Sequence, residues 1–317
     1  MRRRLVLVVL IAVILAVPLL GTREAFSGDR TKIRFGALPV LQALPLYVAQ
    51  EKGLFAKASV EVEIIPFNAA AERDIALSAR SVDGYFGDLI ASMVLIGNGL
   101  DIRVVATNYD SRKDRRMIAV LGKPGCKYHS VADLADVPVA LSSNSVIDFV
   151  TEQLLTSGGV PQKRVASLEA KNIGLRMQML LSGQVEAAAL PEPLATAAIA
   201  KGAVLLADDS GLAPSQTVLG FTGSFIKKHP ETVKAFLRVI NEANRITNTD
   251  PDSVRAVMVE YCRLPESLKR DYPVPRFPVL HAPDKESVET VAAWLKKRGV
   301  INTSLKYGQV VDAGFLP

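Results

Sequence analysis

The strongest constraint on the fold is the alternation of short apolar runs with helical periodicity from Lys32 onward. The first predicted strands cover residues 33–38, 60–65, 82–86 and 102–107. The helices predicted between them lie at residues 42–52, 70–79 and 88–97. This alternation builds sheets from βαβ units, so we expect a doubly wound α/β sheet whose strand ends carry any ligand.

The same alternation starts again in the middle of the chain. Further strands are predicted at residues 117–121, 137–141, 165–168, 185–190 and 217–222, and the last part is mostly helical. Because 317 residues is about twice the usual size of one domain, we predict two doubly wound α/β lobes joined by a two-strand hinge. The expected parts are 28–117 (lobe 1), 118–218 (lobe 2) and 219–317 (the return to lobe 1), with a ligand cleft between the lobes.

Residues 1–27 have the pattern of a secretory signal peptide. Three arginines precede an apolar run at residues 5–20, and Ala25 and Ser27 place small side chains before a cut at Gly28. We therefore expect a periplasmic or other extracytoplasmic protein, with an uncleaved membrane anchor as the alternative. Removing the segment leaves 34 basic and 31 acidic residues, a net charge of +3 rather than +6. Because these charges are interspersed along the chain, no nucleic acid partner is expected.

Enzyme and metal signatures are lacking in the sequence. It has no G-x-S-x-G elbow, P-loop, H-E-x-x-H or Rossmann glycine fingerprint, so no catalytic residue is predicted. The three histidines have no partner at metal-ligand spacing, and no metal or other cofactor is expected. Cys126 and Cys262 are either small buried thiols or a single pair formed in an oxidising compartment.

The first candidate binding segment is Ser142, Ser143, Asn144 and Ser145, which lies between a predicted strand and a predicted helix. Hydroxyl and backbone N–H groups at the positive end of that helix would receive an anion or a carbonyl group. The alternative is ordinary N-capping by Ser145 alone. We favour a ligand role for at least one of these residues, because four small polar residues exceed what one cap requires.

The matching junction in lobe 1 contains Gly87 and Asp88. Glycine would allow a close approach of the backbone to a ligand, and Asp88 would either accept from a ligand amine or cap its helix. Leu41 and Gln42 belong to the loop after the first strand, which we expect to line the cleft. Its apolar character favours a ligand with a hydrophobic or flat portion, unless the leucines simply fill the core of lobe 1.

Further polar side chains occupy comparable strand or helix ends. Asn68, Asn108 and Asn172 would read a polar ligand without bringing a charge, or serve as turn residues. Glu192 follows Pro191 at a helix start, where it would meet a cationic or N–H donor group or complement the helix terminus. The basic cluster around Arg112 to Arg116 is interpreted as a solvated turn, with steering of an anion or docking of an acidic partner as the alternative.

Several segments, in order, resemble one family of proteins. They are PLYVAQEKGLF (45–55), the V-E-V strand at 60–62, the V-D-G strand at 82–84, SVADLADVPVAL (130–141), ALPEPLATAAIAKG (189–202) and FIKKHPETVKAFL (225–237). Together they resemble periplasmic solute-binding proteins of the nitrate, sulfonate and taurine group, which includes binders of thiamine-pyrimidine precursors (NMT1/THI5-like). Arg80 with Ser81, and Asp136, depart from the family pattern and leave the subfamily open.

The resemblance implies a type II periplasmic binding fold and a function in import. Such a protein captures a small solute between its lobes and delivers it to the permease of an ABC transporter in the cytoplasmic membrane. We expect a monomer that makes and breaks no bond. The same architecture resembles thiamine-pyrimidine synthases and chorismate dehydratases, so a cleft enzyme is the alternative, and an exported sensory module is a third.

Overall fold

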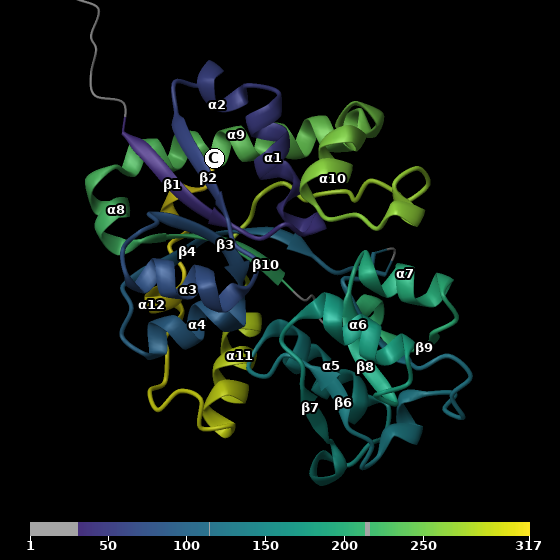
Figure 1. Ribbon diagram of the computed structural model, residues 1–317. Coiled ribbons are helices and arrows are strands. Elements are labelled where there is room, and N and C mark those ends of the chain that lie inside the picture. The colour runs from purple at the N-terminus through teal and green to yellow at the C-terminus, as the bar shows by residue number, and fades with distance from the viewer. Residues whose placement is uncertain (1–30, 114, 213–215) are drawn as a thin grey trace, which may run out of the picture. The chain divides into compact units, whose positions relative to one another are not determined.

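The computed structural model describes residues 31–113, 115–212 and 216–317 and contains two five-stranded mixed sheets (Figure 1). The first sheet has the order β2 (Glu61–Pro66), β1 (Lys32–Ala37), β3 (Gly84–Asp88), β10 (Gln216–Thr222) and β4 (Ile102–Asp110). The second has the order β7 (Ser167–Glu169), β6 (Val139–Leu141), β8 (Ala187–Pro191), β5 (Ile118–Gly122) and β9 (Val204–Asp208). The predicted α/β class with two sheets is confirmed.

Most of the helices lie where the apolar periodicity of the sequence predicts them. The ranges are α1 Leu44–Glu51, α2 Leu54–Lys57, α3 Ala70–Ser78, α4 Leu89–Gly97, α5 Val146–Ser157, α6 Ile173–Leu181, α7 Leu194–Ala200, α8 Gly223–Lys228, α9 Pro230–Thr249, α10 Arg255–Tyr261, α11 Lys285–Lys297 and α12 Tyr307–Val310. Pro45 lies in the first turn of α1, and Gly53 follows its end at a φ of 63°. Strand β9, which forms a half-exposed edge of the second sheet, was not predicted.

The two sheets repeat one arrangement. In the first sheet β1 pairs in parallel with β2 and β3, and in the second β6 pairs in parallel with β7 and β8. Each sheet also contains one antiparallel strand beside this set, β10 in the first and β5 in the second. The strand orders therefore match position by position, with β1, β3 and β10 corresponding to β6, β8 and β5.

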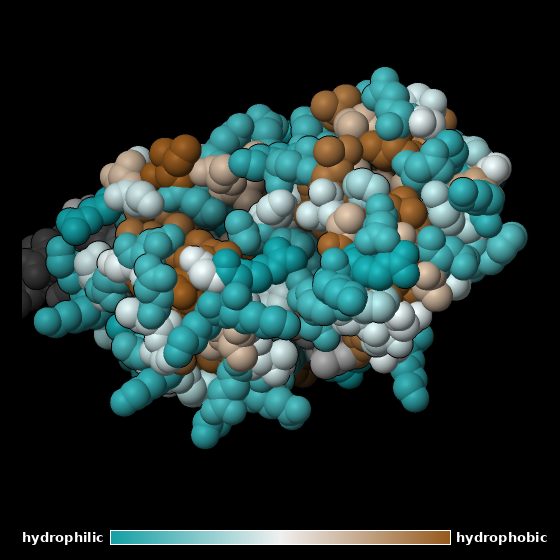
Figure 2. All heavy atoms as spheres, turned by 90° about the horizontal axis from the view of Figure 1, so that it is seen from below, coloured by the Kyte–Doolittle hydropathy of each residue, from teal (hydrophilic) through white to brown (hydrophobic). Residues whose placement is uncertain are grey.

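Helices cover both faces of each sheet, as Figure 1 shows for the first. Buried side chains of α1 and α9 pack on one face of the first sheet, and those of α4 and α11 pack with Val104 and Val218 on the other. In the second sheet, α5 shares the main core, while α6 and α7 enclose a smaller alanine-rich core. The surface seen in Figure 2 is mostly polar, with apolar residues in scattered patches.

The beginning of β5 is fixed to the end of β9 by a buried carboxylate. Asp209 has no exposed surface, and its Oδ1 accepts the N–H groups of Met117 at 2.8 Å and Ile118 at 3.1 Å. This contact joins the two ends of the segment that forms the second sheet. The predicted signal peptide at residues 1–27 lies outside the described residues.

Candidate functional site

At the first sheet, the candidate residues gather where β1, β3 and β4 end. Asn108 is fully buried, and its Nδ2 donates to the backbone oxygen of Gln42 over 2.6 Å. Its Oδ1 is also buried and has no hydrogen-bond partner in the described part of the chain. Leu41 and Gln42 form a buried 3-10 turn before α1. The structure thus brings Gln42 and Asn108 together, although they are 66 positions apart.

The neighbouring end of β3 contains Gly87 and Asp88. Asp88 caps α4, since its Oδ1 accepts the N–H of Ala91 at 2.8 Å, and burial raises the pKa of its carboxyl. Gly87 is buried, and a Cβ added there would lie 3.0 Å from Nη1 of Arg73. The absence of a side chain at Gly87 therefore leaves space for Arg73 of α3.

At the second sheet, the serine cluster of Ser142, Ser143, Asn144 and Ser145 follows β6, as predicted. Ser145 caps α5 by accepting the N–H of Ile147 at 3.2 Å, and its Oγ donates to the backbone oxygen of Ser142. The N–H of Asn144 is bonded to the Asp148 carboxylate at 2.9 Å. Ser143 and Asn144 are exposed, so their side chains are accessible to a solute.

Each sheet also carries one completely buried arginine that sequence reasoning missed. Arg73 in α3 donates from Nη1 to the backbone oxygen of Phe86 over 2.8 Å. Arg176 in α6 donates in the same way to Ala189 over 2.9 Å, and its Nη2 reaches Ser142 Oγ at 3.1 Å. In both cases the oxygen belongs to the residue 13 positions later. Arg176 thus stands directly behind the serine cluster.

Glu192 lies in a buried polar cluster beyond the end of β8. Its carboxylate pairs with Arg116 and accepts the hydroxyls of Thr196 at 3.0 Å and Tyr272 at 3.1 Å. Burial raises the pKa of Tyr272. The expectation that the basic cluster forms a solvated turn is wrong for Arg116, because a buried acid 76 positions away fixes its side chain. The Glu192 carboxylate also accepts the N–H of Thr196 at 3.2 Å, in the first turn of α7, which is the helix-terminus role considered as its alternative.

The other two asparagines have structural partners. Asn172 caps α6, its Oδ1 accepting the N–H of Leu175 at 2.9 Å. Asn68 is exposed and accepts from Arg263 near the end of α10. The structure places Asn172 close to the serine cluster, since the oxygen of the adjacent Lys171 lies 3.5 Å from Ser142 Oγ. Asn68 is not brought to any of the other candidates by a described hydrogen bond.

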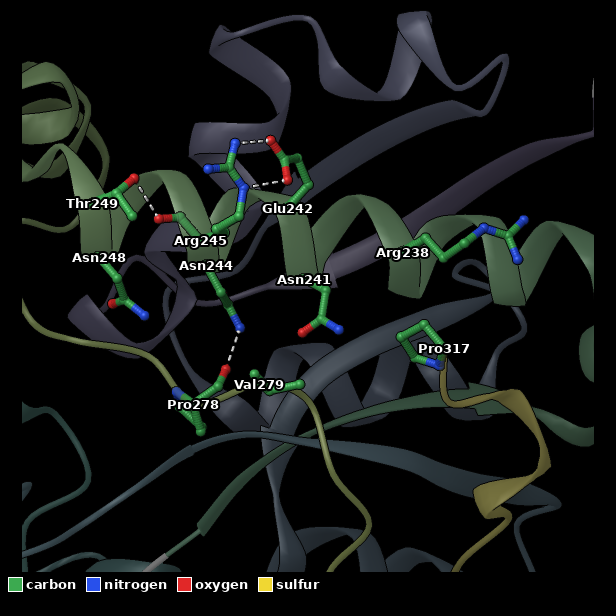
Figure 3. Close-up of a pocket in the computed structure, with 10 residues that line it drawn as sticks. All are labelled: Arg238, Asn241, Glu242, Asn244, Arg245, Asn248, Thr249, Pro278, Val279 and Pro317. Atoms are coloured by element: carbon green, nitrogen blue, oxygen red, sulfur yellow. Dashed lines mark hydrogen bonds and ion pairs between the residues drawn. The ribbon is translucent and has the colours of Figure 1, made fainter.

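Two surface cavities lie away from these residues. One, of about 520 Å³, runs along α9 and is lined by Asn241, Asn244, Asn248 and the Pro278–Val279 segment (Figure 3). Asn244 donates to Pro278 O over 2.9 Å, so the asparagines of α9 hold this segment in place. The other, of about 320 Å³, lies beside Lys32 and Lys228. None of the predicted site residues lines either cavity.

The described residues contain no group of three or more His, Cys, Asp or Glu side chains that could hold a metal ion. Within the same residues, no helix has both the length and the apolar character needed to cross a membrane. Cys126 and Cys262 are free thiols in the structure, the first half-buried and the second buried. The candidate residues at the ends of the strands offer mainly hydroxyl, amide and backbone groups, and buried charged side chains lie behind them.

Comparison with known proteins places the chain in a family. Residues 27–262 match the NMT1-like family, and the chain belongs to it. No curated protein sequence matches it. The following solved structures, which include two periplasmic binding proteins, have the same fold.

The periplasmic aliphatic sulphonate binding protein SsuA from Escherichia coli has a TM-score of 0.76 and 17% identity, over 88% of this chain and 97% of that one. The periplasmic nitrate-binding protein NrtA from Synechocystis PCC 6803 has a TM-score of 0.73 and 15% identity, over 90% and 87%. A C27S mutant of DSZB in complex with biphenyl-2-sulfinic acid has a TM-score of 0.68 and 14% identity, over 90% and 98%. At these identities the structures establish the fold alone.

Proposed function

We propose that this protein is the extracytoplasmic solute-binding component of an ABC importer. It captures a small organic or anionic solute of the nitrate, sulfonate, taurine or pyrimidine-precursor type and delivers it to a membrane permease. The proposal rests on one observation: the chain forms two sheets of matching strand order, and polar groups lie at the strand ends of both. The sulphonate- and nitrate-binding proteins with this fold support it.

The proposed mechanism is a hinged clamp. Lobe 1 (28–117 and 219–317) and lobe 2 (118–218) close on the solute, which exchanges its water for hydrogen bonds from both strand-end clusters. Ser143 and Asn144 contribute from lobe 2, and Gln42, Asn108 and Asp88 form the facing part of lobe 1. The protein acts as a monomer, is exported by residues 1–27, and presents both lobes to the permease when closed.

The first experiment identifies the solute by mass spectrometry of what co-purifies, followed by calorimetric titration. Replacing Ser143 with alanine and Asn144 with glycine is expected to weaken binding several-fold, because the side-chain donors and acceptors are lost. Glycine is chosen because Asn144 has a φ of 59°, which alanine tolerates poorly.

Ser157→Ala, at the exposed far end of α5, is the matched control and should leave the affinity unchanged. Unchanged affinity in the Ser143/Asn144 variant would refute the role of the serine cluster. Turnover of the solute, in place of stoichiometric binding, would favour a cleft enzyme of the thiamine-pyrimidine synthase or chorismate dehydratase type.

A further inference from the structure

The two buried arginines occupy the same position in the repeated arrangement. Tyr85 of β3 pairs with β1 at Gly36, and Ala188 of β8 pairs with β6 at Ala140. The oxygens that accept from Arg73 and Arg176 belong to the residues that directly follow Tyr85 and Ala188. Arg73 therefore donates to β3 at the position where Arg176 donates to β8. A difference in the charge environment of the two arginines must then come from the side chains around them.

The first arginine is neutralised within its own helix. Arg73 donates from Nε at 3.0 Å and from Nη2 at 2.6 Å to Oδ1 of the adjacent Asp74. Its guanidinium also lies 5.6 Å from the centre of the Tyr85 ring. The charge of Arg73 thus has a direct counter-ion, as a buried charge generally requires.

Among the described residues, the second arginine has no such counter-ion. The residue after Arg176 is Met177, and Nε of Arg176 is buried without a hydrogen-bond partner among the described residues. Burial lowers the pKa of Arg176 to about 10, while the charge of Glu169 acts in the opposite direction. Glu169 is exposed and accepts the N–H of Ser143 at 3.0 Å, and it forms no ion pair with Arg176 in the described chain.

The unpaired charge acts on Ser142, the first residue after β6. Nη2 of Arg176 donates to Ser142 Oγ at 3.1 Å, so the serine hydroxyl hydrogen must be donated elsewhere. Its described acceptor, the oxygen of Lys171, is at the long distance of 3.5 Å. A hydroxyl that accepts from a guanidinium and has only a weak acceptor is well suited to donate to a negatively charged group.

We propose that Arg176 is a positioning residue that fixes the polarity of the site. Acting through Ser142, it makes the second-sheet half receive the negatively charged group of the solute. The first-sheet half, where Asp74 neutralises Arg73 and Asp88 is a carboxylate, receives the uncharged or donor part. This inference rests on the proposed function for its physiological meaning, but the anion preference itself can be tested with inorganic anions.

The test measures thermal unfolding of the purified chain with increasing sodium nitrate, and separately sodium sulfate. For the wild type, saturating anion is expected to raise Tm by about 2–4 °C above the shift seen in the Arg176→Gln variant. Met177→Asp gives Arg176 the neighbour that Arg73 has and should abolish the same excess shift while Arg176 remains. Arg73→Gln, in the equivalent position of the first sheet, is the matched control and should retain it.

Arg176→Lys, which restores the charge, should recover at least half of the excess shift, a result that a purely structural role would not produce. If Arg176→Gln does not fold, Met177→Asp decides the question alone. Equal anion shifts in the wild type and Met177→Asp, or no excess shift in the wild type, would overturn the inference. Failure to find any bound solute would instead count against the proposed function. The sulfate series tests the anion preference separately, because inorganic sulfate is not among the proposed solutes.

Discussion

Replacing Arg298 with alanine is expected to destabilise the protein by about 2–4 kcal/mol at pH 7. Arg298 follows α11, which packs on the first sheet, and its guanidinium pairs with Asp148 and Glu152 of α5, which packs on the second. The distance from Nη1 to Asp148 Oδ2 is 2.6 Å, and that from Nε to Glu152 Oε2 is 3.1 Å. The guanidinium also covers the Trp294 ring at 4.5 Å.

The magnitude follows from the burial of the three side chains. Asp148 and Glu152 are only 3% and 6% exposed, so removal of Arg298 leaves two carboxylates without their counter-ion. Breaking a fully buried pair costs about 3–5 kcal/mol. Arg298 itself is 31% exposed, and Asp148 keeps the N–H of Asn144, so the expected loss is below that of two buried pairs.

The stability deficit of the Arg298→Ala variant should depend on pH, and its direction follows from the pKa of Asp148. Burial already raises the pKa of Asp148 above its ordinary value of 3.8, and Arg298 opposes that rise. Without Arg298 the pKa rises further, and the folded state then binds protons at a higher pH than the unfolded state. The variant's stability should therefore fall as the pH increases above about 4, which makes its deficit larger at pH 7 than at pH 4.5.

Urea unfolding followed by circular dichroism at these two pH values measures the deficit. Arg298→Lys, which keeps the charge, should lose less than half as much. A deficit below about 0.5 kcal/mol, typical of a surface pair, or one equal at both pH values, would refute the reasoning.

Two further predictions concern the core and the thiols. Gly84→Ala should cost about 1–3 kcal/mol in urea unfolding, because its Cβ would lie 2.7 Å from the buried rings of Phe35 and Phe221. Gly308→Ala, with no atom within 4 Å of the added Cβ, is the control, and an equal effect of the two would contradict the packing. In thiol titration of the native protein at pH 8, Cys126 should react quickly and Cys262 only on unfolding. Cys262 is 1% exposed and burial raises its pKa to about 12, so equal rates would exclude the buried position.

Much of the fold can be predicted from local signals in the sequence. The strands alternate with amphipathic helices at the expected places, and Asp88 and Ser145 cap helices as the structural alternatives for them required. Asn172, for which a turn was the alternative, also caps a helix. What local signals missed is the edge strand β9, whose residues are mostly half-exposed. Its five-residue apolar run, Ala203 to Ala207, comes shortly after the alanine-rich helix α7, and a short apolar run does not by itself distinguish a strand from a buried helix segment.

The charged part of the site could not be predicted in this way. Arginines are expected at the surface, so nothing marked Arg73 and Arg176 as buried. The backbone oxygens that accept from them come from strands, and the pair of Arg116 with Glu192 joins residues 76 positions apart. The sequence around the two arginines does share one spacing: a valine follows each by nine positions and an acidic residue by ten, at Val82–Asp83 and Val185–Glu186.

The repeated arrangement explains why a site built from two similar halves need not be symmetric. The same strand order places an arginine behind the strand ends of both sheets, but the neighbour of the first is Asp74 and that of the second is Met177. The first residue after β1 is Leu38, whereas the first after β6 is Ser142. Two side-chain differences within a matching backbone arrangement thus distinguish a neutralised arginine from one that donates to a serine hydroxyl. The orientation of a bound solute would then follow from these side chains, because the two backbones offer equivalent positions.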